Sequence, residues 1–166
     1  MSDKYAPNLT TEEMQKILEE EEVGCLCMSV GDEPYAVPVS YAWLDGRIVF
    51  HCATEGRKLD VLKQNPRVCF VVDRSPDRVR PHRAACKNDS GDGGKCTYRF
   101  ESVICFGTAR VLDTIPERFE WLQRFKSYFY ARLDLATDED PVTPAAAEHC
   151  GCVVIEIERM TGRRKD

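Results

Sequence analysis

Residues 41–66 read YAWLDGRIVFHCATEGRKLDVLKQNP, and most of the chain topology follows from this stretch. Asp45-Gly46 is the strongest short signal for a two-residue hairpin, and it lies between two strand-like runs, the second over residues 47–52. Residues 57–64 place apolar side chains on one flank, and Asn65-Pro66 stops that helix. The stretch therefore predicts a β-hairpin that leads through a short turn into a helix.

On the N-terminal side, the sequence predicts a helix followed by two strands. Thr10-Thr11-Glu12-Glu13 has capping-box spacing, and apolar residues then recur three and four positions apart, with Gly24 as the expected terminator. Residues 25–30 and 35–43 alternate in the manner of strands and are separated by turn-forming residues. A strand at 35–43 would form one arm of the hairpin described above.

On the C-terminal side, the sequence predicts two strands around a loop, then a helix and a closing strand. The strands are expected at residues 68–72 and 98–112, with a bulge or bend at Gly107. A helix opens at Thr114-Ile115-Pro116, and the last strand covers residues 152–157. These six strands follow one another through hairpins more than through helices. We therefore expect a mainly β fold with flanking helices, whose antiparallel sheet closes as a barrel.

Length and composition indicate one ordinary globular domain. The 166 residues form a single expected domain, 1–166, in which the Pro- and Gly-rich residues 75–97 are a flexible loop insertion. A net charge of −5 is too acidic for a broad nucleic-acid-binding surface, so we expect no nucleic-acid partner. No apolar run could span a membrane, and the start of the chain lacks the apolar core of a signal peptide. We expect a cytoplasmic protein whose nine cysteines are mostly reduced thiols.

The start of the helix at residues 57–64 is a potential anion site. Its first N–H groups and the positive end of the helix dipole favour an anion, Gly56 allows close backbone approach, and Arg57 and Lys58 add two cations. A phosphorylated cofactor would suit such a site. The alternative is a solvated helix start with ordinary surface cations, which Glu55 supports because its carboxylate repels phosphate.

Several motifs in order resemble the pyridoxamine 5'-phosphate oxidase-related FMN-binding split-barrel family, and most closely its nitroimidazole-resistance-protein-like branch. The likeness covers most of residues 10–112 and the last strand. The segments that carry it are Val37-Pro38-Val39-Ser40-Tyr41, Asp45-Gly46, Phe50-His51-Cys52-Ala53, Gly56-Arg57-Lys58, Asn65-Pro66-Arg67-Val68, residues 98–111 and residues 155–163. The loop at 75–95 is longer than is usual in that branch, and residues 131–149 carry no familiar substrate motif. The resemblance therefore implies the cofactor more firmly than the substrate.

The resemblance implies a six-stranded antiparallel split β-barrel that forms a homodimer with FMN at the subunit interface. Arg57 and Lys58 would bind the FMN phosphate with Thr54 as a hydroxyl donor, and Glu101 and Ser102 would contact the flavin from a neighbouring strand. The flavin pocket would be lined by Val37, Pro38, Val39, Ser40, Tyr41, His51, Cys52 and Ala53. The implied activity is flavin-mediated two-electron reduction of a small electron-poor acceptor such as a nitro compound, with NAD(P)H as a candidate donor.

Several alternatives remain open at this point. His51 is the candidate catalytic residue, either as a proton donor or as a flavin or substrate contact, but a strand-end histidine can also be simply packed. The protein could instead be a flavin carrier or sensor without turnover, a deazaflavin- or haem-binding barrel, or an oxidase of a pyridoxal-type phosphate. A metal site could be drawn from His82, Cys86, Cys96, His149, Cys150 and Cys152, but no CxxC pair supports it, and we expect no metal.

Overall fold

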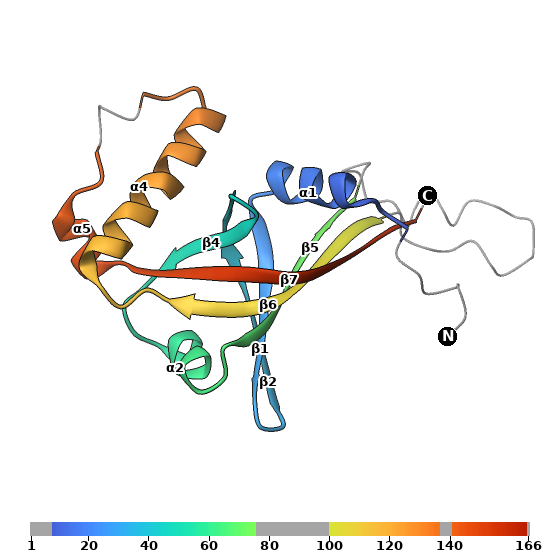
Figure 1. Ribbon diagram of the computed structural model, residues 1–166, viewed down its shortest axis with the longest axis horizontal. Coiled ribbons are helices and arrows are strands. Elements are labelled where there is room, and N and C mark those ends of the chain that lie inside the picture. The colour runs from blue at the N-terminus through green and yellow to red at the C-terminus, as the bar shows by residue number, and fades with distance from the viewer. Residues whose placement is uncertain (1–7, 76–99, 137–140, 166) are drawn as a thin grey trace, which may run out of the picture.

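The computed structural model describes residues 8–75, 100–136 and 141–165 of the chain. The expected loop at 75–97 therefore lies almost entirely outside the described residues. Within them, the elements follow in the order α1 (Thr11–Glu20), β1 (Val23–Val30), β2 (Glu33–Ser40), β3 (Ala42–Leu44), β4 (Arg47–Cys52), α2 (Arg57–Gln64), β5 (Arg67–Arg74), β6 (Phe100–Val111), α4 (Ile115–Arg132), α5 (Pro144–His149) and β7 (Gly151–Lys165). Figure 1 shows α4 and α5 together at one end of the sheet and the C-terminus at the other.

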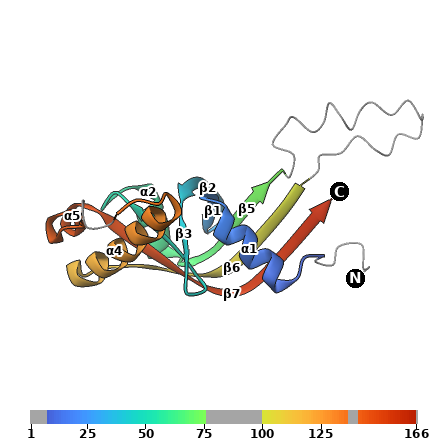
Figure 2. The same cartoon turned by 90° about the horizontal axis from the view of Figure 1, so that it is seen from above.

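The described strands form one antiparallel sheet in the order β2-β1-β5-β6-β7-β4-β3. Its two edge strands, β2 and β3, are joined directly through Tyr41. A sheet whose opposite edges are consecutive in the chain has to curl round on itself, and the side view in Figure 2 shows this curvature. The predicted mainly β, antiparallel split barrel is thereby confirmed.

The sheet contains seven described strands instead of the expected six, because the predicted strand at 35–43 is divided. At Tyr41 the chain leaves β1 and pairs next with β4, so that Ala42–Leu44 is a separate strand. The Tyr41 N–H donates a hydrogen bond to the Glu22 carbonyl at 3.0 Å. This bond belongs neither to the β1–β2 ladder nor to the β3–β4 ladder. Residue pattern alone does not reveal such a change of partner, since both halves have the same β-favouring composition.

Local signals predict turns and helix boundaries well in this chain. Asp45 and Gly46 both have positive φ, of 51° and 75°, as a tight hairpin turn requires. The helix predicted at 57–64 is found at those residues and ends at Asn65. The capping box is present: the Thr10 N–H donates to Glu13 at 2.8 Å, and the Glu13 N–H donates to the Thr10 hydroxyl at 3.2 Å.

Two expectations about boundaries are wrong. Gly24 does not terminate α1, which ends earlier, but lies inside β1, where a Cβ would come 2.2 Å from the Phe70 ring. The closing strand is much longer than residues 152–157, because β7 stays paired with β6 as far as Lys165. The polar and charged residues of its second half lack the apolar character of residues 152–157. The structure also adds the short helix α5.

The core has two parts, one inside the curled sheet and one beneath α4. Inside the sheet, Ile48, Phe50 and Phe70 are fully buried together with the apolar face of α1. On the other side of β4, Val49 packs with Phe125 of α4. Because side chains alternate along a strand, β4 supplies both parts. In the described part of the chain, no helix has the length and apolar character needed to cross a membrane.

Candidate functional site

Except for Glu101 and Ser102, the predicted site residues lie in or next to the region where β2 and β4 are beside each other without forming a ladder. In the described residues β2 pairs with β1, and β4 pairs with β3 and β7, while β2 and β4 are in contact across the curl of the sheet. We call this region the β2–β4 seam and define it by residues 35–40 on one side and 51–58 on the other. The seam is the split of the barrel.

The β2 side of the seam divides the predicted segment between two faces. Val37 packs against the core and Val39 is buried in it, whereas Pro38 and Ser40 are exposed. Because β2 is an edge strand, its backbone groups that point away from β1 lie outside the described ladders. A flat ligand in the seam could therefore meet exposed side chains and unpaired backbone groups of β2.

Tyr41 is a core residue. Its side chain is fully buried, its hydroxyl donates to the Leu18 carbonyl at 2.9 Å, and its ring lies edge-on to Phe70 with centroids 5.0 Å apart. Its N–H is also engaged, as described above. The side chain and N–H of Tyr41 are thus engaged within the fold, and its contact with a flavin stays a prediction.

The opposite side of the seam carries the two predicted cations. Arg57 forms an ion pair with Glu33, and its guanidinium lies 4.7 Å from the centre of the Tyr35 ring. The Lys58 ammonium lies 5.4 Å from the centre of the Phe50 ring. Gly56 is the N-cap residue of α2 and has a φ of 126°. Because glycine has no side chain, it cannot accept a capping hydrogen bond from the first N–H groups of the helix. Ala53 and Thr54 are exposed before it.

Glu33 and Tyr35 were missed by sequence reasoning. They are 24 and 22 positions away from Arg57, in a segment whose sequence predicts only a turn and a strand. The curl of the sheet brings them to the helix start, and no local pattern could have indicated that contact.

His51 and Cys52 point to opposite faces of β4, so they do not line one pocket. Cys52 packs against the barrel core, whereas the His51 ring lies edge-on to Phe125 of α4 with centroids 5.0 Å apart. Partial burial lowers the pKa of His51 below its ordinary value, and the Lys58 ammonium lowers it further. Both effects favour the neutral imidazole, which can donate one hydrogen bond and accept another.

A cavity of about 310 Å³ opens beside His51, between β4 and the helices α4 and α5. Phe125 and Phe129 form part of its wall, with ring centroids 4.9 Å apart. These two rings of α4 therefore line a cavity in addition to packing in the part of the core beneath α4. The cavity depends on α5, which the sequence did not predict.

Glu101 and Ser102 lie far along the sheet from the β4 and α2 side of the seam in the same chain. They occupy the start of β6. At the other end of β6, Val111 pairs with Val153 of β7, which in turn pairs with Phe50 of β4. Ten residues of strand separate these two levels, a distance of about 30 Å. One protomer therefore does not bring Glu101 or Ser102 together with Arg57 and Lys58.

Glu101 has a structural environment of its own. Its carboxylate is 9% exposed and accepts from Arg74 at 2.7 Å and from Arg164 at 2.6 Å. Burial alone would raise the pKa of Glu101, but the hydrogen bonds and charges of the two arginines outweigh it and lower that pKa. The side chain holds the ends of β5, β6 and β7 together.

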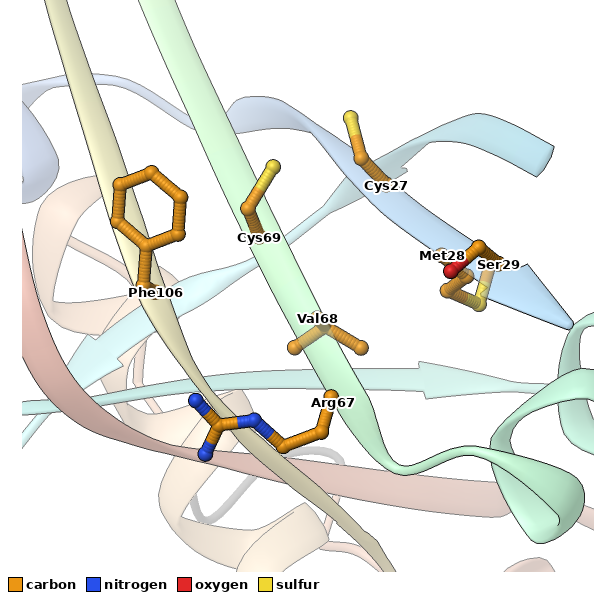
Figure 3. A pocket seen from close by; sticks show the side chains of 7 residues that line it. All are labelled: Cys27, Met28, Ser29, Arg67, Val68, Cys69 and Phe106. Atoms are coloured by element: carbon orange, nitrogen blue, oxygen red, sulfur yellow. The ribbon is translucent and has the colours of Figure 1, made fainter. Parts of the chain in front are cut away.

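A second cavity, of about 320 Å³, lies on the outer face of β1, β5 and β6 (Figure 3). Cys27 and Cys69 are direct cross-strand partners there, and Phe106 borders them. Burial, followed by the neighbouring thiols of Cys69 and Cys25, raises the pKa of Cys27 to about 12. Cys27 is therefore a protonated, weakly nucleophilic thiol at neutral pH.

The residues named for an alternative metal site lie only partly within the described residues. His82, Cys86 and Cys96 lie outside the described residues. Cys150 and Cys152 flank Gly151, where β7 begins. Within the described ranges, no three His, Cys, Asp or Glu side chains are arranged to hold a metal ion.

The arrangement of the sheet matches that of known proteins. A FAD-binding protein from Mesorhizobium loti is 23% identical, with a TM-score of 0.66 over 95% of this chain and 96% of that one. A candidate 5-nitroimidazole antibiotic resistance protein from Bacteroides thetaiotaomicron is 17% identical, with a TM-score of 0.68 over 92% and 82%. A FAD- and heme-binding protein from Mycobacterium smegmatis is 14% identical, with a TM-score of 0.70 over 95% and 72%. These likenesses establish the fold.

Curated proteins contain no match to the chain. The sequence does match one protein family, described as pyridoxamine 5'-phosphate oxidase, over residues 10–164. That range includes every described helix and strand except the last residue of β7. The chain therefore belongs to the pyridoxamine 5'-phosphate oxidase family.

Proposed function

We propose that this protein binds FMN in the β2–β4 seam and passes electrons from it to a small electron-poor acceptor such as a nitro compound. The observation that carries the proposal is the juxtaposition, in a member of this family, of an exposed edge strand with Arg57 and Lys58 at a helix start that has no side-chain cap. Two of the similar solved structures are FAD-binding proteins, which supports a flavin as the ligand class.

The residues of the seam fit a molecule that is flat at one end and anionic at the other. Gly56, Arg57 and Lys58 would hold the phosphate through N–H groups and two cations. Pro38 and Ser40 on the exposed face of β2 would lie along the ring system, where free backbone groups could pair with its polar edge. For phosphate to bind, Arg57 has to exchange its contact with Glu33.

The bound flavin would supply the two-electron chemistry, because no protein side chain carries a hydride. The protein's part is to orient the reactants and to manage protons. His51 is held against Phe125 and would present a neutral imidazole at the edge of the neighbouring cavity. A ring nitrogen of that imidazole could share a proton with the electron acceptor in a hydrogen bond. Apolar walls from α4 would exclude water from that position.

The same proposal includes a homodimer. Glu101 and Ser102 match family positions that contact flavin, yet they lie about 30 Å along the sheet from the level of His51. We infer that the two groups of residues serve one flavin from different protomers. This geometry supports a cofactor shared across a two-fold interface.

Replacement of both Arg57 and Lys58 by Ala tests the cofactor site directly. Each charge-assisted hydrogen bond contributes about 1.5–3 kcal/mol, so the double variant should bind FMN at least about 100-fold more weakly. Quenching of flavin fluorescence measures the dissociation constant, and circular dichroism checks the fold. Riboflavin, which lacks the phosphate, should lose little affinity.

The matched control is the double variant Lys63→Ala and Arg67→Ala, which removes one cation from the last turn of α2 and one from the start of β5. Its affinity for FMN should stay near that of the wild type. Equal FMN affinity in the wild type and the Arg57/Lys58 variant would refute the phosphate site. Parallel titrations with FAD, a deazaflavin and haem distinguish FMN from the other cofactors of related barrels.

Catalytic turnover is a separate question from binding. The holoprotein should be reduced anaerobically with NADH or NADPH and then mixed with nitro compounds and with pyridoxamine 5'-phosphate. Oxidation of the reduced flavin by a nitro compound supports the proposed activity. Tight flavin binding with no acceptor that restores the oxidised spectrum would instead indicate a carrier or sensor.

A further inference from the structure

The cavity beside His51 has walls of a distinct chemical kind. It is built from β4, from one side of α4 and from α5, and its volume is about 310 Å³. Most of its surface is carbon, because aromatic and aliphatic side chains dominate it. The lining residues are His51, Leu122, Phe125, Lys126, Phe129, Tyr130, Val142, Ala146 and Cys150.

The cavity has the size and surface of a site for small aromatic molecules. An apolar cavity of about 150 Å³ is sufficient for benzene, so 310 Å³ offers room for one or two rings. Phe125 and Phe129 are tilted by 45° to each other, and His51 stands at 86° to Phe125. An inserted ring could therefore make stacked and edge-on contacts at the same time.

The polar groups of the cavity do not suit an anion such as a phosphate ester. Lys126 is the only Lys or Arg among the described residues that line the cavity, and its ammonium lies 4.9 Å from the centre of the Tyr130 ring. The imidazole of His51 is the polar group that borders the edge of the Phe125 ring. A hydrogen-bond acceptor on an otherwise apolar ligand could pair with that imidazole.

We propose that this cavity binds a neutral aromatic molecule of one or two rings, oriented by His51, and that it discriminates against phosphorylated aromatics. The inference deepens the proposed function, on which it rests for the role of the ligand as electron acceptor. It defines the acceptor as uncharged, unlike a phosphorylated vitamin. Binding itself requires only the residues of the cavity.

Two neighbouring alanines in α5 allow a matched test. Ala145 and Ala146 are both exposed, but only Ala146 lines the cavity, so Ala146→Trp fills it and Ala145→Trp does not. The probes are 4-nitrobenzyl alcohol, which is neutral, and 4-nitrophenyl phosphate, which is anionic. Titration calorimetry and saturation-transfer NMR measure their binding to the full chain, with and without FMN.

We expect the wild type and Ala145→Trp to bind the alcohol equally, and Ala146→Trp to bind it at least tenfold more weakly. The phosphate should bind the wild type at least tenfold more weakly than the alcohol. The ring nitrogen resonances of His51 should shift when the alcohol binds. Val142→Trp, at another wall, serves as a second filled variant if Ala146→Trp is poorly folded.

The outcomes separate this inference from the proposed function. Unchanged alcohol binding in both filled variants, or tighter binding of the phosphate, overturns the cavity assignment even if FMN binds. Loss of FMN binding in Ala146→Trp also overturns it, because the cavity would then belong to the cofactor. If the wild type ignores FMN while Ala146→Trp still loses the alcohol, the proposed function fails and the cavity assignment stands.

Discussion

At the scale of single residues, the ion pair between Arg57 and Glu33 competes with the proposed ligand. Both side chains are more than half exposed, at 58% and 73%, so the pair itself stabilises the fold little. A phosphate at the same guanidinium has to displace the Glu33 carboxylate. The pair therefore lowers cofactor affinity more than it raises stability.

Glu33→Gln should strengthen FMN binding. Removal of a competing exposed ion pair strengthens binding by about 0.2–1 kcal/mol, which lowers the dissociation constant roughly 1.4- to fivefold. Flavin fluorescence titration measures the change. Asp32→Asn removes a neighbouring turn carboxylate and controls for the general loss of negative charge; an equal gain in that variant would mean that the contact with Arg57 is irrelevant.

Glu101 is the opposite case, a nearly buried carboxylate with two arginine partners. Glu101→Gln leaves Arg74 and Arg164 without their shared charge, and we expect a loss of unfolding free energy on the order of 3 kcal/mol at pH 7. Urea denaturation of wild type and variant measures this difference. Glu158→Gln, which removes an exposed partner of Arg67, should have a much smaller effect.

The effect of Glu101 should also depend on pH with a definite sign. The folded-state pKa lies below that of the unfolded chain, which is about 4.3. The carboxylate therefore contributes its full stability above pH 4.3 and loses it as the pH falls through the lower, folded value. The difference between wild type and Glu101→Gln should shrink below pH 4. A difference that grew in acid would contradict the ion-pair account.

At the scale of elements, the register of the two longest strands depends on one glycine. The pairing of β6 with β7 shifts between Phe106 and Gly107, where a bulge relieves the strain of a long curved ladder. A Cβ at Gly107 would lie 2.0 Å from the Glu156 carbonyl oxygen. The backbone of β7 thus occupies the space that any other side chain would need.

Gly107→Ala should therefore destabilise the protein by about 3 kcal/mol or more, because the backbone of β7 has to move. Thermal and urea unfolding measure the loss. Gly31→Ala is the control. The φ of 56° at Gly31 disfavours alanine, but nothing lies within 4 Å of the added Cβ. This variant should therefore lose only about 1 kcal/mol of unfolding free energy. Similar losses in the two variants would show that close packing at the bulge is unimportant.

At the scale of the whole molecule, the proposed site is incomplete in one protomer. The phosphate end lies in the seam, and the residues expected to complete the flavin contacts lie at the far end of β6. We expect FMN affinity to fall when the protein is diluted into monomers. Sedimentation with detection at the flavin absorbance band should show flavin moving with the dimer and not with the monomer.

Mixed dimers test the same point without dilution. The Arg57→Ala, Lys58→Ala protomer and a Ser102→Trp protomer should each bind FMN poorly alone. If the two regions meet across the interface, every mixed dimer contains one intact site, and mixing should restore up to half of the wild-type binding per heterodimer. No recovery on mixing, with heterodimers present, would place both regions in one protomer and contradict the shared site.

Sequence patterns were sufficient wherever short-range interactions dominate. The capping box of α1, the Asp45-Gly46 turn, the bounds of α2 and the bulge at Gly107 all depend on residues within a few positions of one another. Such interactions leave a local signature because backbone geometry and side-chain chemistry act on the same few residues. The ordered motifs also indicated the family that the comparison with known proteins confirms.

Contacts between distant segments depended instead on how the sheet curls. The division of the predicted strand at Tyr41, the pairing of Arg57 with Glu33, the opposite faces of His51 and Cys52, and the cavity under α5 involve partners that no short pattern relates. Residues far apart in the chain meet only after the sheet has closed on itself, and a side chain's role there follows from its neighbours in space. Local chemistry therefore determined the elements, and long-range packing determined which of their residues share a site.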